Sequence, residues 1–194
     1  MGRAKRILCD GGVYHIVQRG HNKDRLFKNA DDYKVFKGFV RKYKDKHAFD
    51  IFHYCIMSNH FHILLKVHNG DDLPKIMHGI TQSYSYYYRK MYHRAGYVYQ
   101  NRYKSFLVED DTYLLECGRY IERNPLRAGM VKDLSHYHWS SYNFYAKGMP
   151  DDIITEDPLY KDMGMTPEER QKHYCNYLLE SRPYERIVDE VMLG

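Results

Sequence analysis

The sequence has no long hydrophobic run and no pattern of a secretory leader. None of its apolar stretches approaches the roughly eighteen residues that a membrane-spanning helix requires. The apolar stretch that follows Arg3, Lys5 and Arg6 is far too short for the hydrophobic part of a secretory signal. We therefore expect a cytoplasmic protein with no membrane partner.

Cysteine is scarce, and a phosphate-binding loop is missing. The cysteines stand far apart, without a C-x-x-C pair that could bind a metal ion or form a redox dithiol. We expect free, buried thiols at Cys9, Cys55, Cys117 and Cys175. No G-x-x-x-x-G-K-[ST] loop occurs, which excludes a P-loop nucleotide hydrolase.

Tyrosine is the residue in excess. It accounts for 21 of the 194 residues, and aromatic residues together make up 15% of the chain. Amphipathic rings suit stacking on unpaired bases, although protein cores and interfaces use them too. With 30 basic and 25 acidic residues the net charge is +5, which permits a polyanionic partner without requiring one.

The apolar pattern predicts strands and helices in an order typical of one known layout. Alternating or β-branched runs predict strands at about 12–19, 50–57, 60–67 and 104–109, with a tight hairpin at Ser58-Asn59. Helical spacing predicts helices at about 30–48, 72–96 and 111–124, the last one ending because Pro125 disfavours helical dihedrals in the residue before it. We expect an α+β, ferredoxin-like split βαβ sandwich, with an antiparallel sheet, helices on one face and an extra C-terminal helix.

The composition changes near the end of this pattern. The stretch Gly148–Asp152 resembles a linker, and Thr166–Glu169 has the residues of a helix start, with proline at the first helical position and acids in the first turn. We therefore divide the chain into a domain of residues 1–148 and a C-terminal helical tail of residues 149–194.

Two histidine pairs have a spacing that could hold a metal ion. His60 and His62 lie two apart on a predicted strand, so both imidazoles project from one face. His136 and His138 have the same spacing but fall in an expected loop, where solvated or packed histidines are the favoured interpretation. Since no cysteine is close in sequence and structural zinc needs four protein ligands, an open site with oxygen ligands is the better hypothesis.

The last predicted helix of the first domain supplies two further candidates. Tyr120 and Asn124 lie one turn apart on one helix face, so the phenol could attack a substrate while the carboxamide binds a metal ion. Imidazole, amide oxygen and water suit Mg²⁺ or Mn²⁺. On this evidence a packing role for Tyr120 stays open, because tyrosine is so frequent here.

Five segments with recognisable motifs follow one another in a fixed order. They are Tyr14-His15 with Arg19-Gly20, Met57–His62, Gln100–Ser105, Arg119–Gly129 and His138–Tyr142. Together they resemble the single-tyrosine HUH transposases, and among these the REP-associated tyrosine transposases. The likeness covers about residues 1–148. One departure is Ser58, where many relatives have proline; this difference does not touch a ligand.

The resemblance implies a nuclease domain that cuts single-stranded DNA by attack of a tyrosine, leaving a 5′-phosphotyrosine bond and a free 3′-hydroxyl. It assigns Tyr120 as the catalytic nucleophile and His60, His62 and Asn124 as metal ligands. Members of the family recognise a hairpin with an adjacent single strand. Some relatives act as dimers and others as monomers, so a homodimer stays open.

Basic and aromatic residues alternate around these motifs, as expected of a single-strand DNA surface. A solvated helix face is the alternative for each of them. The candidate DNA-binding residues are Arg3, Lys5, Arg6, Arg89, Lys90, Arg94, Arg102, Tyr103, Lys104, Arg119, Arg123 and Arg127.

Three functions compete. The leading hypothesis is a metal-dependent strand transferase with a tyrosine nucleophile. A non-catalytic protein that binds single-stranded or hairpin DNA on the same fold would show affinity without a covalent product. A metal hydrolase that attacks with water would not need Tyr120. The first is favoured because a protein that only binds DNA has no need of the complete set His60, His62, Tyr120 and Asn124.

Overall fold

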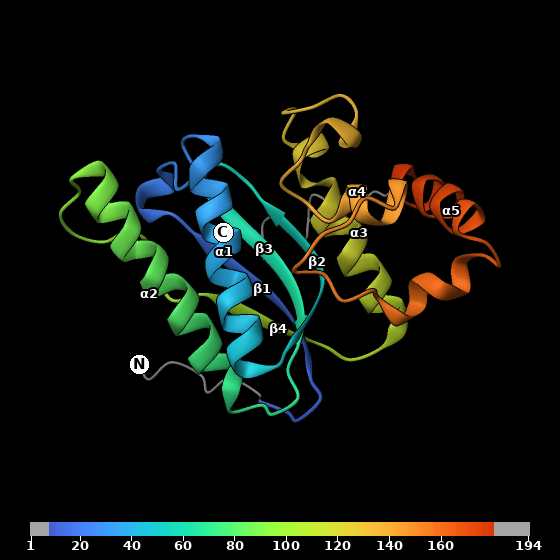
Figure 1. Cartoon of the computed structure of the whole chain (residues 1–194), viewed down its shortest axis with the longest axis horizontal. Coiled ribbons are helices and arrows are strands. Elements are labelled where there is room, and N and C mark those ends of the chain that lie inside the picture. The colour runs from blue at the N-terminus through green and yellow to red at the C-terminus, as the bar shows by residue number, and fades with distance from the viewer. Residues whose placement is uncertain (1–7, 181–194) are drawn as a thin grey trace.

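A four-stranded antiparallel sheet lies at the centre of the computed structural model, which describes residues 8–180 (Figure 1). The strands lie side by side in the order β2-β3-β1-β4. This order is that of the ferredoxin-like split βαβ fold, so the predicted fold class is confirmed. The strands are β1 (Val13–Arg19), β2 (Asp50–Ile56), β3 (His60–Lys66) and β4 (Lys104–Val108).

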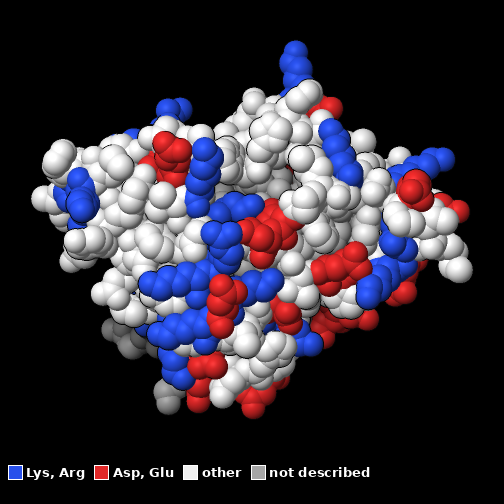
Figure 2. Space-filling view, viewed as in Figure 1, with Lys and Arg blue, Asp and Glu red and all other residues white. Residues whose placement is uncertain are grey.

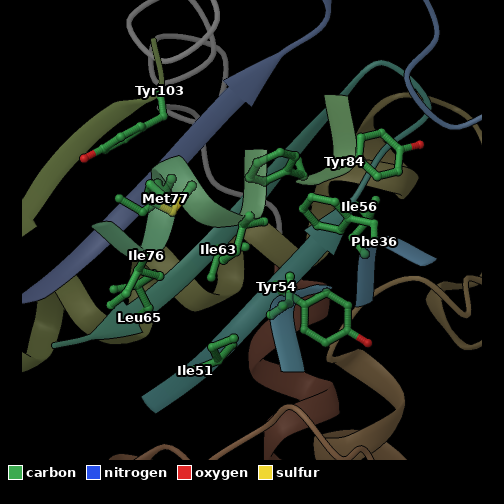
Figure 3. Packing of buried hydrophobic residues seen from close by; sticks show 14 of the residues in the cluster. Phe36, Ile51, Tyr54, Ile56, Ile63, Leu65, Ile76, Met77, Tyr84 and Tyr103 are labelled. Atoms are coloured by element: carbon green, nitrogen blue, oxygen red, sulfur yellow. The ribbon is translucent and has the colours of Figure 1, made fainter. Parts of the chain in front are cut away.

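Two helices cover one face of this sheet and enclose the main core. They are α1 (Ala30–His47) and α2 (Asp72–Tyr92), which stand together on that side in Figure 1. α1 begins where predicted, because the Asn29 side chain accepts from the backbone of Asp31 and Asp32 while Asp32 bonds back in a capping box. Figure 3 shows strand residues such as Ile63 and Leu65 packed against Phe36, Ile76 and Tyr84 of the helices.

The extra helix covers the opposite face. This helix, α3 (Asp111–Arg127), packs Leu114, Cys117 and Ile121 against Val17 and Leu64 of the sheet. A bulge in β2 between Ile51 and His53 shifts the register there, so that His53 and Cys55 point to the α3 face. The sheet therefore presents one continuous surface to the helix that carries the candidate tyrosine.

Two predicted helix ends are wrong. α2 ends at Tyr92, not at Gly96, because His93 takes the left-handed conformation with φ 49. α3 continues through Pro125 to Arg127 rather than stopping at Asn124. Pro125 cannot donate to the Ile121 carbonyl, but the Asn124 side-chain amide does so at 3.2 Å and replaces the missing backbone bond.

The segment after residue 148 is packed against the rest of the chain. Lys37 of α1 forms an ion pair with Asp151 at 2.9 Å, and Arg41 pairs with Asp152, so this segment lies across α1. Figure 2 shows acidic and basic side chains mixed over that helix. Ile153 is buried in the main core, which anchors the segment further. The division into two domains at residue 148 stays a prediction.

Two more helices complete the described chain. They are α4 (Tyr142–Lys147) and α5 (Pro167–Leu179), which starts at Thr166 with the predicted capping box. Short 3₁₀ turns connect the elements at His21–Lys23, Leu134–His136 and Pro158–Met163.

All four cysteine thiols are free, as predicted, but only Cys55 and Cys117 are buried, whereas Cys9 and Cys175 are half-buried. Among residues 8–180, no helix is long and apolar enough to cross a membrane. Arg3, Lys5 and Arg6 lie outside the described residues.

Candidate active site

Three histidines lie together on the sheet face that α3 covers. Antiparallel pairing sets Arg19 of β1 opposite His60 of β3, and Val17 opposite His62. Since side chains alternate along a strand, His15, Val17 and Arg19 share this face with His60 and His62. The ring centroids of His15 and His62 are 5.1 Å apart, and those of His60 and His62 are 5.0 Å apart.

The hydrogen bonds of these rings leave one nitrogen on each candidate ligand without a partner. His60 Nδ1 lies 2.6 Å from the Asn59 side-chain oxygen, and His62 Nδ1 lies 2.9 Å from His15 Nε2. The Nε2 atoms of both His60 and His62 are buried and make no hydrogen bond. A buried polar atom without a partner is costly, which is typical of a site that binds an ion or substrate.

Burial keeps the three rings neutral. It lowers the pKa of His15 to about 3. Burial first, and the charge of Arg19 second, lower the pKa of His60 to about 4. Burial, with His60, His15 and Arg127 nearby, holds the pKa of His62 well below its usual value. Neutral imidazoles keep a lone pair for a metal ion at neutral pH.

Tyr120 of α3 faces this group. Its ring is edge-on to His62, with centroids 5.7 Å apart, and edge-on to His15 at 5.9 Å. The side chain is only 6% exposed. The Arg127 guanidinium lies over the same ring at 4.9 Å. The fold therefore brings together a phenol, two unpartnered imidazole nitrogens and a cation from segments that are far apart in sequence.

Asn124 is held one turn beyond Tyr120. Its amide nitrogen donates to the Tyr120 carbonyl at 2.8 Å and to the Ile121 carbonyl at 3.2 Å. These bonds fix the carboxamide and leave its oxygen as the atom that could bind a cation. The Ile121 carbonyl is available to Asn124 because Pro125 has no N–H to donate to it.

The residues fit a mixed metal site better than an all-protein one. Within residues 8–180, no group of three or more His, Cys, Asp or Glu side chains is arranged to hold a metal ion. The two neutral imidazoles with open Nε2 atoms are an incomplete ligand set for a divalent metal ion. The amide oxygen of Asn124, one helical turn from Tyr120, is a further possible ligand, and water or a phosphate oxygen could fill the remaining positions.

A buried ionic cluster lies where α3, β2 and the C-terminal segment meet. His53 Nδ1 bonds Glu122 Oε1 at 2.8 Å, and His53 Nε2 bonds Asp157 Oδ2 at 3.0 Å. The Ser141 hydroxyl and the Tyr174 hydroxyl, the latter at 2.6 Å, also donate to Glu122. Burial alone would lower the pKa of His53, but the hydrogen bonds and charges of the two carboxylates raise the pKa to about 9.

This cluster connects the tyrosine helix to the sheet and to the C-terminal segment. Gly118 of α3 lies against the His53 ring, where a Cβ atom would come within 2.8 Å of it. Glycine is required at this position because the helix approaches so closely. The cluster therefore fixes the turn of α3 that precedes Tyr120.

The candidate DNA-binding residues differ in their exposure to solvent. Arg89, Lys90, Arg102 and Lys104 are exposed, whereas Tyr103 is buried. Arg94 is half-buried and forms an ion pair with Asp24 at 2.8 Å.

Arg119 and Arg123 lie inside the protein, contrary to the expectation that they form part of a DNA surface. They are 1% and 6% exposed. Arg119 donates to the Tyr177 carbonyl at 3.1 Å, and Arg123 to the Leu178 carbonyl at 2.5 Å. These carbonyls lie in the last turn of α5, which lacks helical donors and favours cations. Both arginines therefore hold α5 against α3, and this placement leaves them no exposed surface for DNA.

Sequence reasoning missed His15 as a member of the site. The alternation of β1 contains a usable signal, because His15 and Val17 share a face. Only the pairing of β1 with β3 brings that face beside His62. His136 and His138 are exposed, with His136 at the end of a short 3₁₀ turn and His138 just beyond it, as expected of a solvated pair.

Comparison with known proteins shows the family of this chain. A family profile described as "Transposase IS200 like" matches residues 10–124, a span that includes His15, His60, His62, Tyr120 and Asn124. The chain belongs to the IS200-like transposase family. A Haemophilus influenzae protein named as a candidate REP-associated tyrosine transposase is 25% identical over 175 residues, covering 81% of this chain and 93% of its own length.

A solved structure shares the fold of this transposase. It is described as a REP-associated tyrosine transposase bound to a REP hairpin. The likeness has a TM-score of 0.65 at 19% identity, and covers 81% of this chain and 93% of the other. At this level of identity the likeness bears on the fold alone.

Proposed function

We propose that this transposase cuts and rejoins single-stranded DNA beside hairpins through a 5′-phosphotyrosine intermediate formed on Tyr120. The observation that carries the proposal is the contact of the Tyr120 ring with His62, beside the two buried Nε2 atoms that have no hydrogen-bond partner. A protein that only bound DNA would have no use for these atoms, since leaving them unpaired costs stability.

We assign His60, His62 and Asn124 as the residues that would hold Mg²⁺ or Mn²⁺. The two Nε2 atoms and the fixed carboxamide support the assignment. A bound divalent ion would polarise the scissile phosphate and offset charge on the departing oxygen. A free phenol has a pKa near 10 and is a weak nucleophile at neutral pH, so cations beside Tyr120 are needed to favour its deprotonated form.

The chemical step exchanges one phosphodiester bond for another. The Tyr120 phenol loses its proton, and its oxygen forms a bond to phosphorus. The bond from phosphorus to the 3′ oxygen breaks, and that oxygen leaves as a 3′-hydroxyl after gaining a proton. Because the phosphotyrosine bond retains the diester, a 3′-hydroxyl can attack it and join strands without nucleotide hydrolysis.

The substrate surface is proposed from the exposed cations. Arg89, Lys90, Arg102 and Lys104 are exposed, and Arg127 lies beside the nucleophile. Lys104 pairs with Val17 across the strands, so it shares the sheet face of His60 and His62. A hairpin is the partner bound by the structural relative, and we propose a hairpin with a single-stranded flank as the partner here.

The proposal is tested with hairpin oligonucleotides labelled at the 5′ or the 3′ end, using a library of flanking sequences. With Mg²⁺ or Mn²⁺, we expect a covalent protein–DNA band that carries only the 3′-side fragment on a denaturing gel, and no such band with a chelator. Cleavage without a covalent band would indicate attack by water. Tight binding with neither product on any flank would instead support the non-catalytic DNA-binding protein.

A separate prediction concerns His15, which we regard as a positioning residue. If His62 binds the ion through Nε2, its proton lies on Nδ1 and is donated to His15 Nε2 across 2.9 Å. Replacing His15 with leucine should therefore weaken Mn²⁺ binding by about tenfold or more. Mn²⁺ binding is followed by electron paramagnetic resonance, without any substrate.

The matched variants separate positioning from folding. His15→Gln keeps an acceptor near the same place and should recover most of the affinity, whereas His136→Leu, at an exposed histidine, should change nothing. Unchanged Mn²⁺ affinity in His15→Leu would contradict the positioning role.

A further inference from the structure

A groove lined by aromatic rings and by polar side chains lies on the face of the sheet opposite the histidines. It has a volume of about 570 Å³ and runs between α2 and residues 97–103. On one wall His78, Thr81, Ser85 and Arg89 follow one face of α2 at helical spacing. The other wall contains Tyr97, Gln100, Asn101 and Arg102.

The chemistry of these walls selects for one class of ligand. No Asp or Glu side chain lines the groove, while two arginines do, so the groove favours an anion. Tyr97 is 76% exposed, a high value for a large aromatic side chain. Amides and hydroxyls can read base edges, guanidinium groups bind phosphate, and exposed tyrosine rings stack on unpaired bases.

The half-buried Tyr99 side chain carries a buried polar atom into the same groove. The Tyr99 hydroxyl is buried and makes no hydrogen bond. Beside it, Gln18 is only 4% exposed and donates through its amide nitrogen to the Asn101 carbonyl at 2.9 Å. These groups form a built floor rather than a flat surface. An unsatisfied hydroxyl at the floor of a groove lined in part by aromatic rings is the feature that a bound base or sugar would complete.

The groove begins next to β1 and β3, the strands that carry the three histidines of the candidate site. The chain at Val98–Gln100 runs beside the end of β1, with His21 N bonded to the Val98 carbonyl at 2.9 Å and Gln100 N to the Arg19 carbonyl at 3.1 Å. Arg19 lies opposite His60 in the sheet. Two strand spacings, or about 10 Å, therefore separate the backbone of His60 from the groove wall. A single strand that leaves the site can reach the groove by crossing this edge.

We propose that the groove binds an unpaired nucleotide of the single-stranded flank next to the cleavage site. The base stacks on Tyr97, its edge meets the groove floor at Tyr99, and its phosphate contacts Arg89 or Arg102. This inference rests on the proposed function for the identity of the substrate. Its test uses binding alone, so that it can fail or succeed whether or not the protein cleaves DNA.

The first test is affinity for a short oligothymidine, measured by fluorescence anisotropy with Tyr97→Ala. We expect a loss of about tenfold, because stacking contributes strongly to single-strand binding. Tyr86→Ala is the matched control, since Tyr86 is 71% exposed on α2 and does not line the groove. A blunt-ended hairpin, which offers no unpaired flank, should bind both variants as it binds the wild type.

The second test locates the contact directly. An oligothymidine that carries one photoreactive 5-iodouracil is crosslinked to the Tyr120→Phe variant, which cannot form the proposed covalent intermediate. Trypsin cuts after Arg94 and Arg102, so we expect the crosslink in the peptide of residues 95–102. Crosslinks confined to other peptides, or equal losses of affinity for Tyr97→Ala and Tyr86→Ala, would overturn the proposal. The expected crosslink in a protein that cleaves no DNA would refute the proposed function alone.

Discussion

Tyr120→Phe is expected to abolish the covalent protein–DNA product and to leave DNA affinity within about twofold of the wild type. The substitution removes one oxygen from a ring that packs edge-on to His62 and His15, so the fold and the histidines stay in place. If that oxygen is the nucleophile, strand transfer falls by about three orders of magnitude or more. Denaturing gels and anisotropy on the same oligonucleotides measure both quantities.

Tyr113→Phe is the matched control for this variant. Tyr113 lies on the same helix but is 37% exposed and makes no ring contact with the histidines. We expect wild-type strand transfer from it. Cleavage that survives in Tyr120→Phe, or that disappears in Tyr113→Phe, would remove Tyr120 from the role of nucleophile.

Glu122→Leu is expected to lower the free energy of unfolding by about 3 to 5 kcal/mol. The substitution leaves the buried His53 imidazolium with one carboxylate and the Tyr174 hydroxyl without its acceptor. Urea unfolding can be followed by the fluorescence of Trp139, the single tryptophan, which stacks on Tyr33 with ring centroids 4.5 Å apart. A loss below about 1 kcal/mol would contradict the structural role of the cluster.

The control for this prediction is an exposed ion pair. Lys34 and Asp31 are 3.5 Å apart with side chains 68% and 79% exposed. Lys34→Ala should therefore cost less than about 1 kcal/mol, because exposed pairs contribute little.

The same cluster predicts how stability depends on pH. The groups that face His53 are Glu122, Asp157 and the rings of Tyr145 and Tyr174. Its pKa in the folded protein is about 9, above the ordinary 6.5. A raised pKa stabilises fully below pH 6.5, and this stabilisation is lost as the pH rises through 9.

We therefore expect the free energy of unfolding to fall by about 3 kcal/mol between pH 6.5 and pH 9, through proton release from His53. Urea unfolding over this range measures the change. In His53→Leu this part of the pH dependence should disappear. A wild-type stability that is flat over the same range would contradict a protonated His53.

Sequence reasoning succeeded where the local pattern carries the information. The strands, the hairpin at Ser58-Asn59 and the caps at Asn29 and Thr166 follow from alternation and from polar side chains that replace missing backbone partners. The spacing of His60 and His62 predicted a shared face, and the sheet register places them on one.

It failed where one side-chain hydrogen bond or a distant segment decides the outcome. The rule for proline predicts an end to α3 at Asn124, but the Asn124 side chain supplies the bond that Pro125 cannot. Arg119 and Arg123 are basic residues beside a tyrosine, and only the packing of α5 shows that they bind its carbonyls. His53 is one histidine among many until the bulge in β2 turns it toward Glu122.

The most direct test of the account is to identify the residue that carries DNA after cleavage. The covalent product is digested with nuclease and trypsin, and the peptide that retains a nucleotide is sequenced by mass spectrometry. We predict the nucleotide on Tyr120, in a peptide ending at Arg123, attached through its 5′ phosphate. A nucleotide on Tyr113 or on any other residue, or attachment through a 3′ phosphate, would contradict the proposed mechanism.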